Sequence, residues 1–451
     1  MRPRRRRFFT FWTWLAGFIL LLLFAHMTAI SVTGRMIENE IRRIRQRGEP
    51  VSARDIAPPS VPDEQNAARV YERALLALPS DQEFKHLGRA LFRSVSFREP
   101  LSDPKARQIV WASEPAIRLL EQAANMPRCS LPIEPWRLIG VLPPQWDLCR
   151  KSDVLLLARA LIRAEKGDSR AALADIATAL AMADHFRAQP WFISEPDSVS
   201  RTQRLVRTLN RVVQVAPPSR ADCRRIYDLL ATIDHVGPAR RLMQGHRALL
   251  IWSFDKARKE GWVARDLEPG QGKRSGLRLL GACVAEWAWW PLLNLDELSG
   301  LRTCQKGMLL ADRPYSQLLR ESAKMPWYAV RSRDCIAFSV GYYQQAVART
   351  GLAQWGLALE VYRHQVGTYP NSLRQVRSTV GWRLPKDPYS GKDFIYRRKG
   401  AGYILYSVGF NQRDDGSIGH DDERGPRRPE CMRLLYARRP GDDIAWGMPP
   451  E

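Results

Sequence analysis

The feature that most constrains this chain is an apolar run from Phe8 to Ile30, which contains no Asp, Glu, Lys or Arg. A helix of that length rises roughly 34 Å, at about 1.5 Å per residue, and so reaches across the hydrocarbon core of a bilayer. A cleaved signal peptide has a much shorter apolar region and a small-residue cleavage site, and this run has neither property. The sequence therefore predicts a transmembrane helix within residues 1–34.

Basic residues flank the apolar run on both sides. Five arginines stand among residues 1–7, directly against the run, and five more are spread over residues 35–47. Positive charge next to a span tends to stay in the cytoplasm. The denser first group therefore predicts a single-pass protein of the inner (cytoplasmic) membrane with a cytoplasmic N-terminus. The bulk of the chain would then lie on the periplasmic or extracytoplasmic side.

Length and charge limit the remaining possibilities. A chain of 451 residues is expected to form two or three domains. The formal net charge of +23 would attract anionic partners such as lipid headgroups or acidic polymers. The basic residues do not gather in one later block, so we favour arginines scattered over solvated helix faces. No helix-turn-helix or RNA-binding signature accompanies the charge, and we do not expect nucleic acid to be a partner.

A juxtamembrane helix and a linker are predicted over residues 35–62. Ile37, Ile41 and Ile44 recur at helical spacing after the apolar run. Residues 49–62 contain four prolines, which indicates an extended linker before the next domain.

Helical patterning dominates residues 63–330, which we take as the body of the protein. Asp63 is the expected N-cap of its first helix. The clearest unit extends from Leu155 to Phe186, where two apolar helical stretches are separated by a break at Gly167 and Asp168. With its stripe of small residues, this hairpin resembles a tetratricopeptide unit, although no 34-residue repeat recurs.

Tryptophan is concentrated in the third quarter of the chain. The residues are Trp252, Trp262, Trp287, Trp289 and Trp290. We favour an aromatic core, and the alternative is an aromatic groove or a contact with a membrane surface. A second membrane span over residues 279–295 is not expected, because Arg278, Glu286 and Pro291 interrupt it.

Residues 331–451 change from helix to strand. A helix is predicted over residues 339–366, and the apolar period changes after it. Residues 393–397 and 403–408 alternate in strand fashion across a Gly-containing turn, which predicts an antiparallel hairpin. Residues 431–437 are a candidate third strand. The expected fold is therefore mostly α, with an N-terminal transmembrane helix, a helical body and a small C-terminal α+β module with an antiparallel sheet.

Four short motifs follow one another in this C-terminal module. They are Gly367-Thr368-Tyr369-Pro370, Leu384-Pro385-Lys386-Asp387-Pro388, Tyr406-Ser407-Val408-Gly409 and Asp443-Ile444. In this order they resemble the C-terminal half of the major pseudopilin of type II secretion systems. The resemblance implies a helix that ends near the first motif, loops that lead into a small sheet, and a calcium-binding loop after the third motif.

The N-terminal signature of that family is a short leader ending in Gly before a Phe-Thr-Leu-Ile-Glu run, and it does not occur in this sequence. We therefore expect neither processing by a prepilin peptidase nor a helix that packs into a pilus. The whole layout resembles families of bacterial membrane-anchored envelope proteins, which supply an architecture and no activity.

Acidic and amide side chains near the last two motifs are candidate calcium ligands. The set is Asn411, Asp414, Asp415, Asp442 and Asp443. Calcium takes six to eight oxygens, which this set helps to supply if the loop folds back on itself. The EF-hand register fails because Arg413 falls at a ligand position. A solvated acidic turn that pairs with nearby arginines is the alternative.

Known sequence motifs of catalysis and of metal binding assign no reaction to this chain. The sequence has no C-x-x-C pair, H-E-x-x-H, G-x-S-x-G or Walker A motif. The histidines in helical sequence, including His235, are expected to be structural. Cys129 and Cys149 flank a proline-rich segment and are the best disulfide candidates if the body is exported.

Three functions stay open. The first is a non-enzymatic, membrane-anchored envelope protein that acts as a scaffold or interaction module for protein partners, beside a type II secretion-like assembly. The second is an enzyme that acts on envelope polymers, with Glu195 and Asp197 as candidate acids. The third is a protein of reversed topology whose basic body faces the cytoplasm and binds anionic lipid or nucleic acid.

Overall fold

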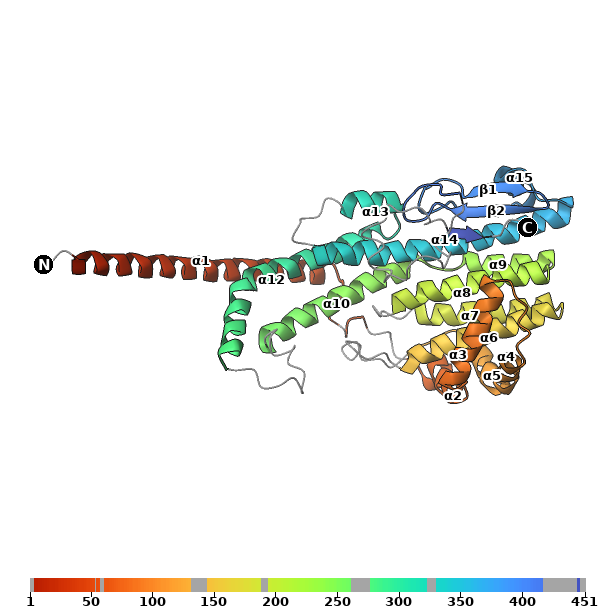
Figure 1. The fold of residues 1–451 in the computed structure, drawn as a ribbon, viewed down its shortest axis with the longest axis horizontal. Helices are drawn as coiled ribbons and strands as arrows, with labels where there is room; N and C mark the ends of the chain where they lie inside the picture. Colours follow the sequence, from red (N-terminus) through yellow and green to blue (C-terminus); the bar gives the residue numbers. More distant parts are fainter. Residues whose placement is uncertain are drawn as a thin grey trace. The chain divides into compact units, whose positions relative to one another are not determined.

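The computed structural model describes residues 4–52, 54–56, 61–130, 144–187, 194–260, 276–322, 330–416 and 444–446. Helices dominate, and a small antiparallel sheet lies near the C-terminal end of the chain (Figure 1). The predicted fold class is confirmed. The chain forms two compact units: an anchor unit of Met1–Ile56, Met243–Lys306 and Met325–Arg333, and a main unit of Ala57–Leu242, Gly307–Lys324 and Asp334–Glu451.

The anchor unit is built on three helices. They are α1 (Arg4–Gln46), α10 (Val236–Glu260), which enters the unit at Met243, and α12 (Gly276–Leu310), which leaves it after Lys306. The predicted span and the predicted juxtamembrane helix are one continuous helix, α1. The apolar spacing seen in the sequence is used for packing, since Ile37 and Ile44 are buried against α10 and α12.

A buried arginine holds the segment that follows α1. The Arg247 side chain is fully buried, and its Nη1 donates to Glu49 Oε2 at 2.6 Å. Its Nη2 donates to the Pro50 carbonyl oxygen at 2.9 Å. Burial acts to raise the pKa of Glu49, but hydrogen bonds from Arg247 and Arg47 outweigh it and hold that pKa below its ordinary value. The first residues of the predicted linker are therefore packed into the anchor unit.

The main unit begins with a stack of helices. After a 3₁₀ turn at Asp63–Gln65 come α2 (Ala67–Leu76), α3 (Asp81–Ser96), α4 (Pro104–Ala112), α5 (Glu114–Ala124), α6 (Pro144–Glu165), α7 (Ser169–Arg187), α8 (Ser194–Val215) and α9 (Arg220–Ala231). The predicted hairpin is confirmed as α6 and α7, with Gly167 between them at a φ of 81°. The predicted cap was wrong, because Asn66 and not Asp63 accepts the hydrogen bond at the start of α2, from the Ala68 amide.

A buried ion cluster joins three of these helices. Arg159 of α6 donates through Nη2 to Asp175 of α7 at 2.6 Å, and the Asp175 side chain is 1% exposed. Glu114 and Glu121 of α5 also accept from Arg159. Removal of one member of a buried ion pair leaves the other charge uncompensated, so the cluster fixes α5, α6 and α7 against one another.

The C-terminal part of the main unit contains three further helices and the sheet. The helices are α13 (Tyr315–Ser322), α14 (Val330–Val366) and α15 (Leu373–Val380), and the strands are β1 (Ile395–Lys399), β2 (Gly402–Ser407) and β3 (Ile444–Trp446). β1 and β2 pair in register from Ile395 opposite Tyr406 to Lys399 opposite Gly402, which confirms the predicted hairpin. The third strand is β3, whereas the candidate at 431–437 lies outside the described residues.

Strand β3 packs on α14 at a glycine. Trp446 is 2% exposed, and its Nε1 donates to the Tyr403 hydroxyl at 3.2 Å. A Cβ atom at Gly356 would lie 2.1 Å from Trp446 Nε1, so no larger residue fits at Gly356 without movement of the indole ring.

We expect Gly356→Ala to lower the free energy of unfolding by about 1–3 kcal/mol through overpacking, which outweighs the gain of up to ~1 kcal/mol in helix propensity. The matched control is Gly88→Ala in α3, where a Cβ meets nothing within 4 Å and the same gain in propensity is unopposed. Thermal unfolding of the full chain in detergent compares the two variants. Equal melting temperatures would contradict the packing of β3 on α14.

Candidate functional site

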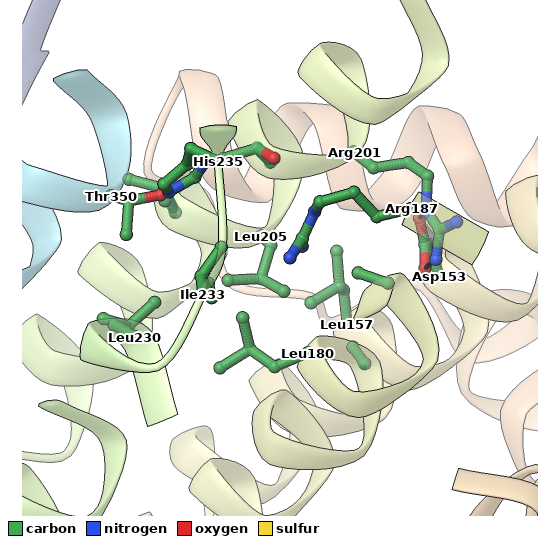
Figure 2. A pocket seen from close by; sticks show the side chains of 14 residues that line it. Asp153, Leu157, Leu180, Arg187, Arg201, Leu205, Leu230, Ile233, His235 and Thr350 are labelled. Carbon is green, nitrogen blue, oxygen red and sulfur yellow. Dashed lines mark hydrogen bonds and ion pairs between the residues drawn. The ribbon is translucent and has the colours of Figure 1, made fainter. Parts of the chain in front are cut away.

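The main unit contains a small cavity lined by α6, α7, α8, α9, the connection after α9, and α14 (Figure 2). Its volume is about 20 Å³, which is room for a single water-sized group. The apolar wall is made by Leu157, Ala179, Leu180, Ala183, Leu205, Val206, Leu230 and Ile233. The polar lining residues are Asp153, Arg187, Arg201, Thr202, His235 and Thr350.

Helical spacing brings the polar lining residues to the cavity together with its apolar wall. Asp153 and Leu157 are four residues apart on α6, as are Arg201 and Leu205 on α8. Residues at this spacing lie on the same face of a helix. Each helix therefore presents one charged and one apolar side chain to the same space.

Asp153 and Arg201 form a buried, bidentate ion pair at one side of the cavity. Arg201 Nε donates to Asp153 Oδ2 at 2.6 Å and Arg201 Nη2 donates to Oδ1 at 2.9 Å. Both side chains are about 95% buried, with exposures of 6% and 5%. Arg204 Nη2 lies 3.6 Å from the same carboxylate. Both oxygens of Asp153 are thus neutralised by arginine, which is the strongest geometry for such a pair.

Arg187 supplies a second guanidinium, from the last turn of α7. Figure 2 shows it pointing into the cavity, while Arg201 turns toward Asp153. Asp184 is its hydrogen-bond partner: Asp184 Oδ1 accepts from Nη1 at 3.2 Å, and the Asp184 side chain is 71% exposed. Burial, with a further contribution from Arg201, lowers the pKa of Arg187 against the opposing effect of Asp184. Among the described residues Asp184 is the hydrogen-bonded counter-charge of Arg187, and the charge of Asp234 also acts to raise the pKa of Arg187.

Two further polar atoms at the cavity have no hydrogen-bond partner among the described residues. They are His235 Nε2 and Thr350 Oγ1, and both atoms are buried. Burial, and then the nearby charge of Arg187, lowers the pKa of His235 to about 3, so the imidazole is neutral. A buried polar atom without a partner is costly. In its Nε2–H tautomer His235 donates a hydrogen bond to a small anion, as do the Thr350 hydroxyl and the Arg187 guanidinium.

The candidate calcium ligands that the structure describes are bonded to protein groups. Asp414 Oδ1 accepts from the Tyr406 hydroxyl at 2.6 Å, and its Oδ2 accepts from Arg397 Nη2 at 2.8 Å. The Tyr406 hydrogen bond is the main cause of a lowered pKa at Asp414. Asn411 Nδ2 donates to Asp415 Oδ2 at 2.6 Å.

No group of three or more metal-ligating side chains gathers within the part of the chain that the structure describes. Asp442 and Asp443, the other two candidates, lie outside that part. The described members resemble the alternative of an acidic turn paired with arginine more closely than a shared ligand set. Calcium binding by the full set stays a prediction.

Two of the C-terminal motifs meet at a buried carboxylate that the sequence did not single out. Asp387, from the Leu-Pro-Lys-Asp-Pro motif, is 1% exposed and accepts from the Ser407 hydroxyl of β2 at 2.7 Å. It also accepts from the amide of Tyr389 at 3.0 Å and the hydroxyl of Ser390 at 3.1 Å. These motif residues thus hold the loop against the sheet, which is a structural role.

The candidate disulfide is not formed in this structure. Cys129 and Cys149 both carry thiols, and burial raises the pKa of the Cys129 thiol to about 12. A thiol with such a pKa is a poor nucleophile at neutral pH.

Comparison of the chain with models of protein families, with curated proteins and with solved structures found no match. The resemblances to a pseudopilin and to a tetratricopeptide unit therefore stay predictions. The function has to be argued from the geometry of the chain itself.

Sequence reasoning did not single out Asp153, Arg187 or Arg201, and it assigned His235 a structural role. The sequence does contain one feature that points to Asp153. Asp153 directly precedes the apolar run Val154–Ala158, and a carboxylate on such a stretch requires a buried cation. The identity of that cation was not readable, because Arg201 is 48 residues away on another helix.

The lowered pKa of His235 predicts a specific sensitivity to acid. In the unfolded chain the imidazole has an ordinary pKa of about 6.5, so between that value and about pH 3 the unfolded state binds more protons. Above pH 6.5 His235 is neutral in both states and costs no stability. As the pH falls, its protonation in the unfolded chain lowers the free energy of unfolding. We expect the wild type to lose up to about 2 kcal/mol more than His235→Gln between pH 7.5 and 5.0. Urea unfolding of both proteins in detergent measures this, and parallel losses would refute it.

Proposed function

We propose that this protein is a single-pass, membrane-anchored envelope protein whose main unit binds a small anionic group of a partner. It acts in this proposal as a scaffold or interaction module and not as an enzyme. The observation that carries the proposal is the exposed apolar surface of α1. None of an 18-residue apolar stretch of this helix is buried by the rest of the described structure.

The exposure of α1 changes abruptly along its length. Trp14 is 80% exposed and Phe24 is 71% exposed, whereas Thr33 and Ile37, one to two turns beyond the apolar run, are 8% and 3% exposed. An apolar surface of this extent marks a contact with another protein or with a membrane, and the length of the run fits the hydrocarbon core of a bilayer. Below this level the same helix packs into a protein core, so the anchor is continuous with the fold.

The cavity in the main unit supports binding in preference to catalysis. It admits about one water-sized group, so a carboxylate tip or a chloride ion fits and a sugar ring does not. Its carboxylate, Asp153, has both oxygens bound by Arg201 and is held in a structural ion pair. Glu195 and Asp197, the acids considered for hydrolysis, have side chains outside the described part.

We propose the orientation in the membrane and the place beside a secretion assembly from features of the sequence. The density of arginines before the apolar run supports a cytoplasmic N-terminus, with the bulk of the chain on the extracytoplasmic side of the inner membrane. The pseudopilin-like motifs support a place beside a secretion assembly, where the main unit would dock on envelope proteins.

The anchor is tested by one substitution in the span. We expect Leu21→Arg, at the centre of the apolar run, to cost about 2.5–3.5 kcal/mol of insertion free energy and to shift the chain from the membrane pellet after alkaline-carbonate extraction. Leu76→Arg is the matched control, because Leu76 is 89% exposed on α2 of the main unit and should change nothing. A C-terminal reporter that is active only in the cytoplasm should be silent. Activity of that reporter would establish the reversed topology.

Anion binding is tested by thermal melting of the full chain in detergent at constant ionic strength. We expect chloride, formate and acetate to raise the melting temperature relative to bulky gluconate, because a ligand that binds only the folded state stabilises it. Arg187→Gln should abolish the difference between these anions. Arg224→Gln is the control, since Arg224 makes a solvent-exposed pair with Asp228 on α9. The same melting temperature in all four anions would rule out the site.

A further inference from the structure

Helix α12 runs alongside α1 in a fixed register. His26 Nε2 of α1 lies 3.0 Å from the Trp287 carbonyl oxygen, and Asn294 Nδ2 donates to Thr33 Oγ1 at 2.9 Å. Each pair is separated by 261 positions in the sequence, so the two helices run in the same direction. Leu298 continues the contact with the buried isoleucines of α1.

This register sets the depth of Trp287 relative to a bilayer. His26 precedes Ile30, the last residue of the apolar run, by four residues or about 6 Å of helix. The ring centroids of His26 and Trp287 are 4.1 Å apart. If α1 spans the membrane, Trp287 therefore lies at the boundary between the acyl chains and the headgroups. Tryptophan is enriched at this boundary, where its ring is buried and its N–H stays wet.

The side chains of α12 around this point are apolar and exposed. Val284 is 58% exposed, Trp289 is 61%, Trp287 is 40% and Leu292 is 49%. The expected aromatic core is therefore wrong for Trp287 and Trp289. Pro291 lies inside the helix, where a proline bends it, and the first part of α12 turns away from α1 (Figure 1). A helix that leaves a membrane span sideways at this depth lies along the membrane surface.

We propose that residues 284–292 of α12 form a second membrane contact, embedded in the interface between headgroups and acyl chains beside α1. The inference rests on the proposed anchor. The occupant of the exposed surface is the lipid bilayer, because that surface is continuous with α1 through the His26–Trp287 contact. Among the described helices only α1 is long and apolar enough to cross, so α12 enters one leaflet without spanning.

The contact is tested by quenching of tryptophan emission with lipids brominated near the top of the acyl chain. The full chain is reconstituted in phosphatidylcholine vesicles and recovered by flotation. We expect the double variant Trp287→Ala, Trp289→Ala to lose about a third to a half of the lipid-quenchable emission, while Trp12 and Trp14 of the span retain theirs. The matched control is Trp111→Ala in α4 of the main unit, where Trp111 is 59% exposed, and it should leave that emission unchanged.

The outcomes separate the two proposals. A wild-type chain that does not float with the vesicles overturns the anchor. A chain that floats, but whose lipid-quenchable emission is the same in the double variant, overturns the interfacial helix and leaves the anchor standing. If the emission contributed by Trp287 and Trp289 is insensitive to brominated lipid but changes on dilution, the surface contacts a second copy of the chain, which also overturns the interfacial helix. If the double variant loses its helical circular dichroism, Trp289→Ala alone decides the question, with about half the loss expected.

Discussion

Buried pairs of arginine with carboxylate tie the elements of this protein together. Arg159 with Asp175, Arg201 with Asp153, and Arg247 with Glu49 each join two segments that are distant in the sequence or lie on different helices. Removal of one partner from a buried pair typically costs about 3–5 kcal/mol, because the other charge is left without compensation. The excess of arginine was expected to cover solvated helix faces. Part of it instead lies in the interior, where the planar guanidinium can bind a carboxylate with two hydrogen bonds.

The parts of the fold that the sequence predicted are those specified by local patterns. The apolar run, the helical spacing of Ile37 and Ile44, the α6–α7 hairpin with its break at Gly167, and the β1–β2 hairpin all follow from residues close together in the chain. The packing of α10 and α12 with α1 was not predictable in this way. Periodicity shows that a helix has an apolar face, and it does not show which surface covers that face. The tryptophans illustrate the point, since the same composition is compatible with a protein core and with a lipid interface.

The candidate site depends even more on contacts between distant segments, which local sequence patterns do not reveal. The acidic loop was chosen because its carboxylates are close in sequence, yet Asp414 binds Tyr406 of β2 and Arg397 of β1. The cavity combines Asp153, Arg187, Arg201, His235 and Thr350, which come from four helices and the connection after α9. No window of sequence contains this set. What makes it a candidate for anion binding is the burial of the Arg187 guanidinium beside two polar atoms that have no partner among the described residues, and burial is a property of the assembled helices.

The apolar helix α1 is part of the packed anchor unit and not an appendage to it. A domain attached to a span through one flexible linker can rotate freely about it. Here α1 continues without a break from the exposed apolar run into a packed core, and Arg247 holds the first residues after it. The chain also passes between the anchor unit and the main unit at five points, after residues 56, 242, 306, 324 and 333. The anchor unit therefore includes residues from the middle of the chain, and one of these segments, in α12, carries the exposed tryptophans. A single span fixes depth but leaves tilt and rotation free, and a second contact in the interface removes both freedoms.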